Sequence, residues 1–449
     1  MLACALFVAA LAGCDKAPKP AAAPAPTAAA QPAAKPGPAP AAKSAPAPAA
    51  KSAPAPAAQA GTPPNGLLVV YSNFEVKDGK ATAKPTAAEL DALVEQGGEW
   101  KVHDKIVDPD SNVYHKAMVL TEDGHQSILT IGGMGAYVKL WNKRDGTWVQ
   151  KTIWHAKFGG KIDRMRDVEA ADLFGDGKND LVVATHDQGV VELLRPQADG
   201  TWSKTELSRK PNTFIHEIEI GDLDGDGVPE VYATSSEPNK LGGAVQRGDV
   251  VRYVPKRGEG PTVVAKLGDR HAKEIYVGDV DGDGRDELYV SVEALTAGQG
   301  ADLHVVKPVE IRRYDADTPP DAGVVIATLP DRFCRFLTVG DVDGDGKKEM
   351  VAAAFSSGLW LLRPGTNPRG EWGKERIDAD SGGWEHASLL ADLDEDGKDE
   401  LYVADDKDGE LRRYVWRNGR PSREVIRKRP IPGAQITWNL MPVPVALLK

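Results

Sequence analysis

The segment GDLDGDGVPEVYAT, residues Gly221–Thr234, places three aspartates at alternate positions and follows them with a glutamate and a short apolar run. Near-copies recur as DLFGDGKNDLVVA from Asp172, DVDGDGRDELYVS from Asp279, DVDGDGKKEMVAA from Asp341 and DLDEDGKDELYVA from Asp392. The first aspartates of successive copies lie 50, 57, 62 and 51 residues apart. A period of this length is typical of repeat folds and suits a propeller blade of four strands.

The residues around each acidic loop follow one order. The apolar run after the loop leads through a turn to a second strand-like segment, such as GVVELLRP, GDVVRYVP or GELRRYVW, and then to another, often opened by Gly-x-Trp. Together with the segment before the loop, this gives four segments per unit, rich in the β-branched and aromatic residues expected of strands.

Two further units complete the predicted architecture. Residues His115–Trp141 keep the strands but shorten the acidic loop to Thr121–Gly124. Near the N-terminus, GLLVVYSNFEV and GEWKVHDKIV supply a third and a fourth strand, and the C-terminal GAQITWNLMPVPV resembles the missing inner strands. We therefore predict an all-β, seven-bladed β-propeller over residues 65–449, closed by pairing of its N- and C-terminal segments so that no sheet edge is exposed.

One insertion in the first blade has a helical pattern. In PTAAELDALVEQGG, Thr86 is followed three residues later by Glu89 and then by apolar residues at helical spacing. We expect a capping-box helix that ends at Gly97.

The N-terminal region indicates export. Residues 1–14, MLACALFVAALAGC, end in a motif that resembles the lipobox of bacterial lipoprotein signal peptides, and this resemblance implies lipidation of Cys14. Because no Lys or Arg precedes the apolar run, we expect the natural start to lie upstream of Met1. Residues 15–64 are rich in Ala, Pro and Lys, a composition typical of a disordered linker. We expect a protein anchored by lipid to a membrane of the bacterial cell envelope, on its extracytoplasmic side.

Charge and cysteine content narrow the function classes. Residues 1–64 carry a net +4, which leaves −15 for the remainder of a chain whose net charge is −11. An acidic globule is a poor nucleic-acid binder, so we expect no nucleic-acid partner. Cys4 and Cys14 lie in the N-terminal stretch, which leaves Cys334 as a lone, buried thiol and the folded part without a disulfide.

The acidic loops have the composition of a calcium site. Aspartates at positions 1, 3 and 5 of a tight loop converge on one centre, glycines permit the turn, and an acid at position 9 closes the cage. Oxygen-only, multi-carboxylate sites favour Ca²⁺ over softer metals. An EF-hand places its last ligand at position 12 and continues as a helix, whereas here the acid at position 9 runs directly into a strand-like segment.

This pattern resembles the FG-GAP or VCBS repeats of integrin-like propellers over roughly residues 110–405. In that family a Ca²⁺ loop joins the first and second strands of a blade, and the expected role of the ion is structural. The carboxylate ligands that the resemblance implies are Asp222, Asp224, Asp226, Glu230, Asp279, Asp281, Asp283, Glu287, Asp341, Asp343, Asp345, Glu349, Asp392, Asp394, Asp396 and Glu400. Backbone carbonyls of Val228, Arg285, Lys347 and Lys398 would complete these sites. The first loop has Phe174 at its third position, so Asp172, Asp176 and Asp180 should form a weak or empty site. Solvated acidic turns without metal are the alternative for the four complete loops.

A ring of basic residues is expected at the opposite end of the channel. Six residues before each loop lie His115, Arg166, His216, Lys273, Arg335 and His386. Such a ring would attract an anionic ligand. Alternatively, these side chains pair with Asp167, Glu217, Glu274 and Glu385 and hold the blades in register, or the three imidazoles bind a transition metal. The enlarged loops at Ser235–Asp249 and Glu293–Lys307 should lie on the same rim, where repeat proteins often bind their ligands.

The leading functional hypothesis is a calcium-stabilised binding or scaffolding module whose ligand is an anionic glycan or a protein. No nucleophile motif or phosphate-binding loop is present, so we favour a protein without enzymatic activity. The main rival is an enzyme of the polysaccharide-lyase type that acts on an anionic polysaccharide with a His or Arg of the ring. A third possibility is a subunit of an envelope complex.

Overall fold

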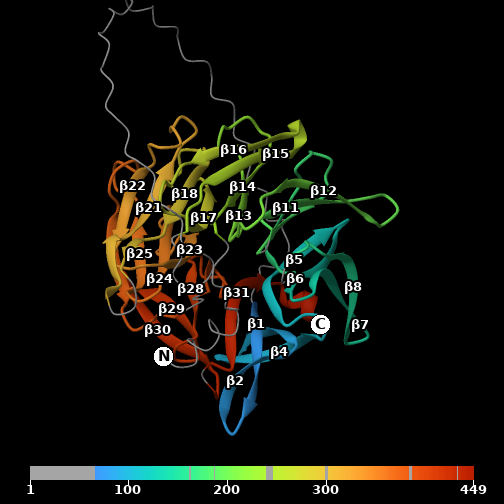
Figure 1. The fold of residues 1–449 in the computed structure, drawn as a ribbon. Helices are drawn as coiled ribbons and strands as arrows, with labels where there is room; N and C mark the ends of the chain where they lie inside the picture. Colours follow the sequence, from blue (N-terminus) through green and yellow to red (C-terminus); the bar gives the residue numbers. More distant parts are fainter. Residues whose placement is uncertain are drawn as a thin grey trace, which may run out of the picture.

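The computed structural model describes residues 66–160, 163–186, 188–238, 246–298, 302–383, 387–431 and 433–449. These residues form seven antiparallel sheets arranged in a ring around a central axis, six with four strands and one with five (Figure 1). The innermost strands of neighbouring sheets contact one another all the way round. The predicted seven-bladed β-propeller is therefore confirmed. The expected signal peptide (1–14) and linker (15–64) lie outside the described residues.

Blades 2 to 7 follow one another along the chain, each with its strands in order from the channel outward. Blade 2 contains β5 (Val113–Glu122), β6 (His125–Gly133), β7 (Ala136–Arg144) and β8 (Thr147–Ala156). Blade 3 contains β9 (Met165–Ala171), β10 (Asp180–Thr185), β11 (Val190–Pro196) and β12 (Trp202–Arg209). Blade 4 contains β13 (Ile218–Gly221), β14 (Glu230–Thr234), β15 (Val250–Val254) and β16 (Glu259–Ala265), with a short 3₁₀ turn, η1 (Pro255–Arg257), between the last two.

The remaining blades repeat this arrangement. Blade 5 contains β17 (Ala272–Gly278), β18 (Glu287–Val292), β21 (Val309–Tyr314) and β22 (Val324–Leu329), and the hairpin β19 (Leu295–Ala297) and β20 (His304–Lys307) is inserted between its second and third strands. Blade 6 contains β23 (Cys334–Gly340), β24 (Glu349–Ala354), β25 (Gly358–Arg363) and β26 (Gly373–Asp378). Blade 7 contains β27 (Ser388–Ala391), β28 (Glu400–Asp405), β29 (Glu410–Arg417) and β30 (Arg420–Lys428).

Blade 1 joins the two ends of the ordered chain. Its innermost strand is β31 (Gln435–Val443), which pairs antiparallel with β1 (Gly66–Lys77) from Asn73↔Gln435 to Gly66↔Val443. The blade continues through β3 (Ala88–Gln96) to β4 (Glu99–Asp108), β2 (Lys80–Pro85) extends β1 as a hairpin, and η3 (Val445–Leu448) ends the chain. Closure by the two ends is thus confirmed, but the C-terminus supplies one inner strand rather than several, because β1 is the second strand of the blade and not the third.

The helix expected from Thr86 to Gly97 is wrong, because this segment is the third strand of blade 1. β3 pairs with β1 on one side and with β4 on the other. Leu90, Ala92 and Val94 pack toward blade 2, whereas Leu93 faces blade 7. A strand buried on both faces is apolar at most positions, so its apolar residues also satisfy a helical spacing. Ladder pairing on both sides decided the outcome against local propensity.

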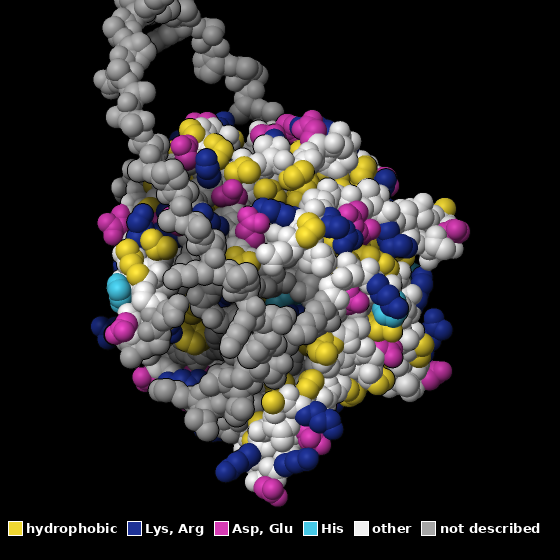
Figure 2. Space-filling model, in the orientation of Figure 1, with side chains coloured by type: hydrophobic (Ala, Val, Ile, Leu, Met, Phe, Trp, Pro, Cys, Tyr) yellow, Lys and Arg dark blue, Asp and Glu magenta, His cyan; other side chains and the backbone are white. Residues whose placement is uncertain are grey.

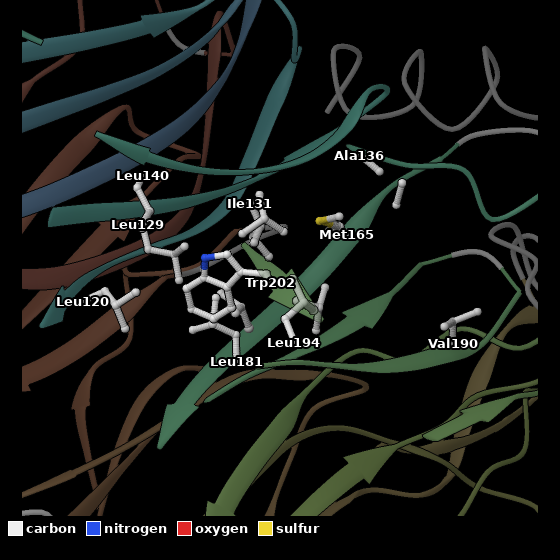
Figure 3. Packing of buried hydrophobic residues seen from close by; sticks show 14 of the residues in the cluster. Leu120, Leu129, Ile131, Ala136, Leu140, Met165, Leu181, Val190, Leu194 and Trp202 are labelled. Carbon is white, nitrogen blue, oxygen red and sulfur yellow. The ribbon is translucent and has the colours of Figure 1, made fainter. Parts of the chain in front are cut away.

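The hydrophobic core consists of seven clusters, and each cluster fills the space between two neighbouring blades. Between blades 2 and 3, the indole of Trp202 on the outer strand β12 packs among Leu129, Leu181 and Leu194 (Figure 3). No blade has a core of its own, since each sheet buries its two faces against its neighbours. The ring is therefore stable only when it is closed.

Cys334 is a free and fully buried thiol, as expected. Within the part of the chain that the structure describes, no helix has the length and apolar character needed to cross a membrane.

Candidate functional site: the acidic loops and the basic ring

The acidic loops connect the first and second strands in blades 3 to 7, as expected, and they lie at one end of these blades. Each loop is ordered by its own first aspartate. Asp341, for example, accepts backbone N–H groups from Gly344, Asp345 and Gly346 at 2.7, 3.2 and 2.8 Å. Asp172, Asp222, Asp279 and Asp392 accept equivalent N–H groups in their loops.

Two further hydrogen bonds recur in these loops. The residue at position 7 donates its backbone N–H to the aspartate at position 5 in all five loops, through Lys178, Val228, Arg285, Lys347 and Lys398. In blades 3 to 6 the acid at position 9 also accepts the backbone N–H of position 2, as Glu349 does from Val342 at 3.1 Å. The hydrogen bonds of the turn therefore bring its carboxylates close together without the help of an ion.

Carboxylate oxygens converge in four of the five loops. Ligand atoms lie within 4.8 Å of one another in four groups, namely Asp279, Asp281, Asp283 and Glu287; Asp222, Asp224 and Asp226; Asp341, Asp343 and Glu349; and Asp392, Asp394 and Glu400. The Oδ1 atom of Asp343 is buried and has no hydrogen-bond partner. An all-oxygen, carboxylate-rich donor set fits Ca²⁺. Glu230, Asp345 and Asp396 lie outside these groups, and the loop that contains Asp172, Asp176 and Asp180 forms no such group among the described residues.

The glutamates at position 9 have raised pKa values. Burial raises the pKa of Glu230, Glu287, Glu349 and Glu400 to about 7 each. Neighbouring arginines, such as Arg252 beside Glu230, oppose this shift, and the aspartates of the loops add to it. Without a divalent cation, these loops therefore hold more negative charge than their surroundings stabilise.

An arginine from the third strand of each blade reaches into the loop of the same blade. Arg252 on β15 lies 2.7 Å from Glu230, and Arg313 on β21 lies 2.6 Å from Asp281 and 3.1 Å from Glu287. Arg413 on β29 contacts Asp394 and lies 3.6 Å from Glu400. Arg363 on β25 is more distant, at 3.8 Å from Asp343 and 4.0 Å from Glu349. The four carboxylate groups, called cages below, thus differ in how much positive charge the protein places beside them.

The loop from Asp172 is neutralised by the protein. Arg195 on β11 pairs with Asp176 at 2.9 Å and with Asp180 at 3.0 Å. The same guanidinium stacks on the ring of Phe174, 3.5 Å from its centroid. A cation–π contact therefore occupies the place where the other loops have a third-position carboxylate.

These arginines were missed from the sequence, although a signal was present. All five third-strand segments contain an arginine near their ends, in LLRP, VVRY, IRRY, LLRP and LRRY. The register explains their reach, because Arg252, Arg313 and Arg413 lie opposite Tyr232, Tyr289 and Tyr402, two residues beyond the position-9 glutamate. Each of these tyrosines donates its hydroxyl to that glutamate.

Five of the six predicted ring residues are buried near the inner ends of their blades: His115, Arg166, His216, Lys273 and Arg335. His386 lies outside the described residues. Nδ1 of His115 lies 2.5 Å from the carbonyl of Met165 in blade 3, and its ring packs edge-on against Trp438 of blade 1. These contacts cross blade boundaries. Figure 2 shows a hollow near the centre of one face of the molecule, with Lys or Arg and His side chains in its wall.

Aromatic rings and further cations complete this layer. Phe333 lies beneath the charged groups of Lys273 and Arg335, at 5.6 and 4.7 Å from its centroid. Nε2 of His216 lies 3.1 Å from the hydroxyl of Ser236, in the enlarged loop of blade 4, so that loop lies at the same end as the ring.

The imidazoles in this layer are neutral at physiological pH. Burial, followed by the charge of Arg166, holds the pKa of His115 well below its usual range. Burial and Lys273 do the same for His216 and lower the pKa of His271 to about 3. The positive charge of the layer therefore belongs to Arg and Lys side chains.

An acidic layer follows along the same inner strands. Lys116 pairs with Asp167 at 2.9 Å and with Glu169, so Asp167 pairs here with a lysine outside the predicted ring. Burial, with Asp167 next in importance, raises the pKa of Glu217 well above its usual range. The channel wall thus changes from basic to acidic between the ring and the loops.

Comparison with known proteins agrees with this geometry. A family model described as an FG-GAP-like repeat matches residues 172–233 and 341–403, which contain the loops of blades 3, 4, 6 and 7. The protein is a β-propeller with FG-GAP-like repeats. The comparison with curated proteins found no match for this chain.

Several solved structures resemble this chain in fold. A putative 6-phosphogluconolactonase from Bacteroides fragilis aligns with a TM-score of 0.51 and 13% identity over 85% of this chain and 98% of that chain. A lectin from Agrocybe aegerita that recognises non-reducing terminal N-acetylglucosamine aligns with a TM-score of 0.47 and 14% identity, over 84% and 95% of the two chains. The Dos1 propeller aligns with a TM-score of 0.49 and 11% identity, over 77% and 80%. At these identities the likeness concerns the propeller fold alone.

Proposed function

We propose that this protein is a calcium-stabilised binding module, held at a membrane of the bacterial cell envelope by a lipid on Cys14 and the linker of residues 15–64. The observation that carries the proposal is the convergence of carboxylate oxygens in four consecutive blades, at one end of a propeller whose other end is basic. Each cage is local and repeated, so the ions would brace blades rather than take part in catalysis.

The residues that would hold the ions are those of the four carboxylate groups. When bound, Ca²⁺ would supply positive charge at the centre of each loop. The protein itself already orients and partly neutralises these carboxylates. Backbone N–H groups orient the first aspartate of each loop, and an arginine offsets the charge of the acid at position 9. The proposed ion is therefore the remaining element of a preformed turn.

The ligand that we propose is anionic, either an acidic glycan or an acidic surface of another protein. Arg166, Lys273 and Arg335 supply the positive charge of the ring, and the chain around them is acidic overall. Such a ring attracts anions by its local field. The hairpin β19–β20 adds recognition area, since Leu303, Val305 and Val306 on it are exposed.

Binding of the full chain to a panel of uronate polymers and their neutral counterparts tests this proposal. We expect affinity for the acidic polymers, weakened by salt and by Arg335→Gln, but not by Arg423→Gln, which removes an exposed arginine on the outer strand β30 of blade 7. Equal binding of acidic and neutral polymers would contradict an anionic ligand. Release of unsaturated sugars during the incubation would instead indicate a lyase.

The membrane anchor has a separate test. Metabolic labelling with a fatty-acid probe should mark the protein in its native host, and Cys14→Ala should abolish the label and release the protein from membranes. Continued membrane association of the unlabelled variant would refute the lipid anchor and leave the propeller proposal untouched.

A further inference from the structure

The eighth residue of the acidic loop in blades 5, 6 and 7 connects that loop to the loop of the preceding blade. Asp399 Oδ2 accepts the backbone N–H of Asp341 at 2.7 Å, and Asp286 Oδ2 accepts the backbone N–H of Asp222 at 2.8 Å. Lys348 makes the corresponding contact with the opposite polarity, because its Nζ donates to the carbonyl of Asp279 at 3.0 Å. In all three cases the contact falls on the first residue of the neighbouring loop.

The backbone is shaped for this approach. Gly340 precedes Asp341, and a Cβ on it would lie 2.4 Å from Asp399 Oδ2. Gly221 precedes Asp222, and a Cβ there would lie 2.3 Å from Val277 and 3.0 Å from Asp286 Oδ2. The N–H of Asp399 also donates to the carbonyl of Asp341 at 2.8 Å, so this pair of loops is joined in both directions.

The row of contacts stops where the cages stop. In blade 4 the eighth residue is Pro229, which has neither an N–H group nor a polar side chain, and the loop it would reach is the one with Phe174. Asn179 of blade 3 reaches the carbonyl of Thr121 in blade 2, but neither of those loops forms a carboxylate group. Three contacts therefore join the four cages in one uninterrupted row.

The position of these residues makes them suited to transmit binding. Asp399 lies between Lys398, the expected carbonyl ligand, and Glu400, the expected carboxylate ligand, of its own cage. It also fixes the backbone of Asp341, the first ligand of the next cage. An ion that orders residues 398–400 would therefore reduce the ordering cost of the cage at Asp341. Lys348 and Asp286 have the same placement.

We propose that the four loops of blades 4 to 7 bind Ca²⁺ as one cooperative row, and that Asp286, Lys348 and Asp399 are the positioning residues that couple neighbouring ions. This inference rests on the calcium binding proposed above. Coupling of this kind is reciprocal, so each ion raises the affinity of both neighbouring loops.

The test is a titration of the metal-stripped full chain with Ca²⁺ alone, by calorimetry. We expect four ions per chain and a Hill coefficient above 1. Asp399→Ala should still bind four ions, because Asp399 is no ligand, but with a Hill coefficient closer to 1 and a loss of about fivefold or more in the affinity of the weakened step. Asp399→Asn retains an acceptor oxygen and should keep most of the coupling.

The control is Asp199→Ala, which removes the same charge from an exposed turn of blade 3. A metal-free measurement accompanies it, since hydrogen exchange at the Asp341 amide in chelator should accelerate in Asp399→Ala and not in the control. Four independent ions in the wild type, or identical isotherms for the Asp399→Ala and Asp199→Ala variants, would overturn the inference alone. A wild-type chain that binds no calcium would overturn both the inference and the calcium proposal.

Discussion

At the scale of single residues, the acidic loops are distinguished by the cations that the protein places beside them. Arg313 is almost completely buried and is shared by Asp281, Glu287 and Asp315, whereas Arg363 is one-third exposed and lies no closer than 3.8 Å to the carboxylates of its loop. Removing one partner from a buried ion pair leaves an uncompensated charge, while a distant and exposed pair contributes little.

We therefore expect Arg313→Gln and Arg363→Gln to differ when no metal is present. In chelator, Arg313→Gln should lower the free energy of unfolding by about 3–5 kcal/mol, and Arg363→Gln by less than about 1 kcal/mol. Urea unfolding measures both. Calcium should restore part of the loss in Arg313→Gln, and similar losses in the two variants would refute the ranking of the loops.

A second prediction at this scale concerns His271. Burial, with Lys273 next, lowers its pKa to about 3, whereas an unfolded histidine titrates near 6.5. As the pH falls from about 6.5 toward 3, the unfolded chain takes up a proton that the native state does not bind. This group alone therefore lowers the free energy of unfolding by about 1.4 kcal/mol for each unit that the pH falls over this range.

His271→Gln should remove that contribution, so the stability of the variant should fall less steeply than that of the wild type below pH 6.5. Denaturant unfolding at several pH values measures the difference. His304→Gln on the exposed strand β20 is the matched control for the loss of an imidazole. Parallel curves for the wild type and His271→Gln would contradict the burial argument.

At the scale of elements, β3 shows how a blade joins its neighbour. Asp91 on β3 is fully buried and accepts a hydrogen bond from Arg427 of β30 at 2.6 Å, and Lys105 of β4 lies 3.3 Å from its second carboxylate oxygen. Arg427 also donates to the hydroxyl of Tyr71 on β1 at 2.9 Å. This polar contact joins blade 7 to blade 1, at the boundary where the two ends of the chain close the ring.

We expect Asp91→Ala to destabilise the protein by about 3–5 kcal/mol, because it removes a fully buried carboxylate and leaves Arg427, whose side chain is three-quarters buried, without its charged partner. Asp91→Asn keeps an acceptor oxygen and should cost less. Glu237→Ala, which removes the exposed partner of Lys210, should have an effect near zero. Thermal unfolding compares the three variants, and a mild effect of Asp91→Ala would show that the contact is dispensable for closure.

The sequence predicted most strands because each repeat contains the same local pattern of residues. An acidic turn followed by an apolar run identified the first and second strands in five blades. The pattern failed in blade 1, where no acidic loop marks the register and β3 has apolar residues that fit both a helix and a doubly buried strand. Its partners β1 and β4 are strands, and this pairing is not visible in the segment itself.

At the scale of the whole molecule, stability depends on the ring being closed and on every blade retaining its shape. The seven core clusters all lie between blades, so disorder in one loop weakens the two neighbouring interfaces. Ions bound only by the native state stabilise it in proportion to the logarithm of their concentration.

The melting temperature of the full chain should therefore rise with calcium and fall in EDTA. When the free calcium concentration is about 100 times the dissociation constant of a site, that site adds about 2.7 kcal/mol to the free energy of unfolding. Magnesium, which demands a smaller octahedral site, is the control and should have a weaker effect. A melting curve that is the same in EDTA and calcium would refute a stabilising role for the ions.

The amino-acid sequence by itself determined the number of blades, the place of the acidic loops between first and second strands, and the closure of the ring by its two ends. These features follow from the spacing of acidic, glycine and apolar residues along the chain. That spacing repeats, so it can be recognised in a single sequence. Only the tertiary structure decided which cations oppose each cage, which blade ends meet in the basic ring, and that Asp286, Lys348 and Asp399 reach the loop of the preceding blade. These contacts join residues 13 to 69 positions apart or on different blades, and their geometry is set by strand register and blade packing.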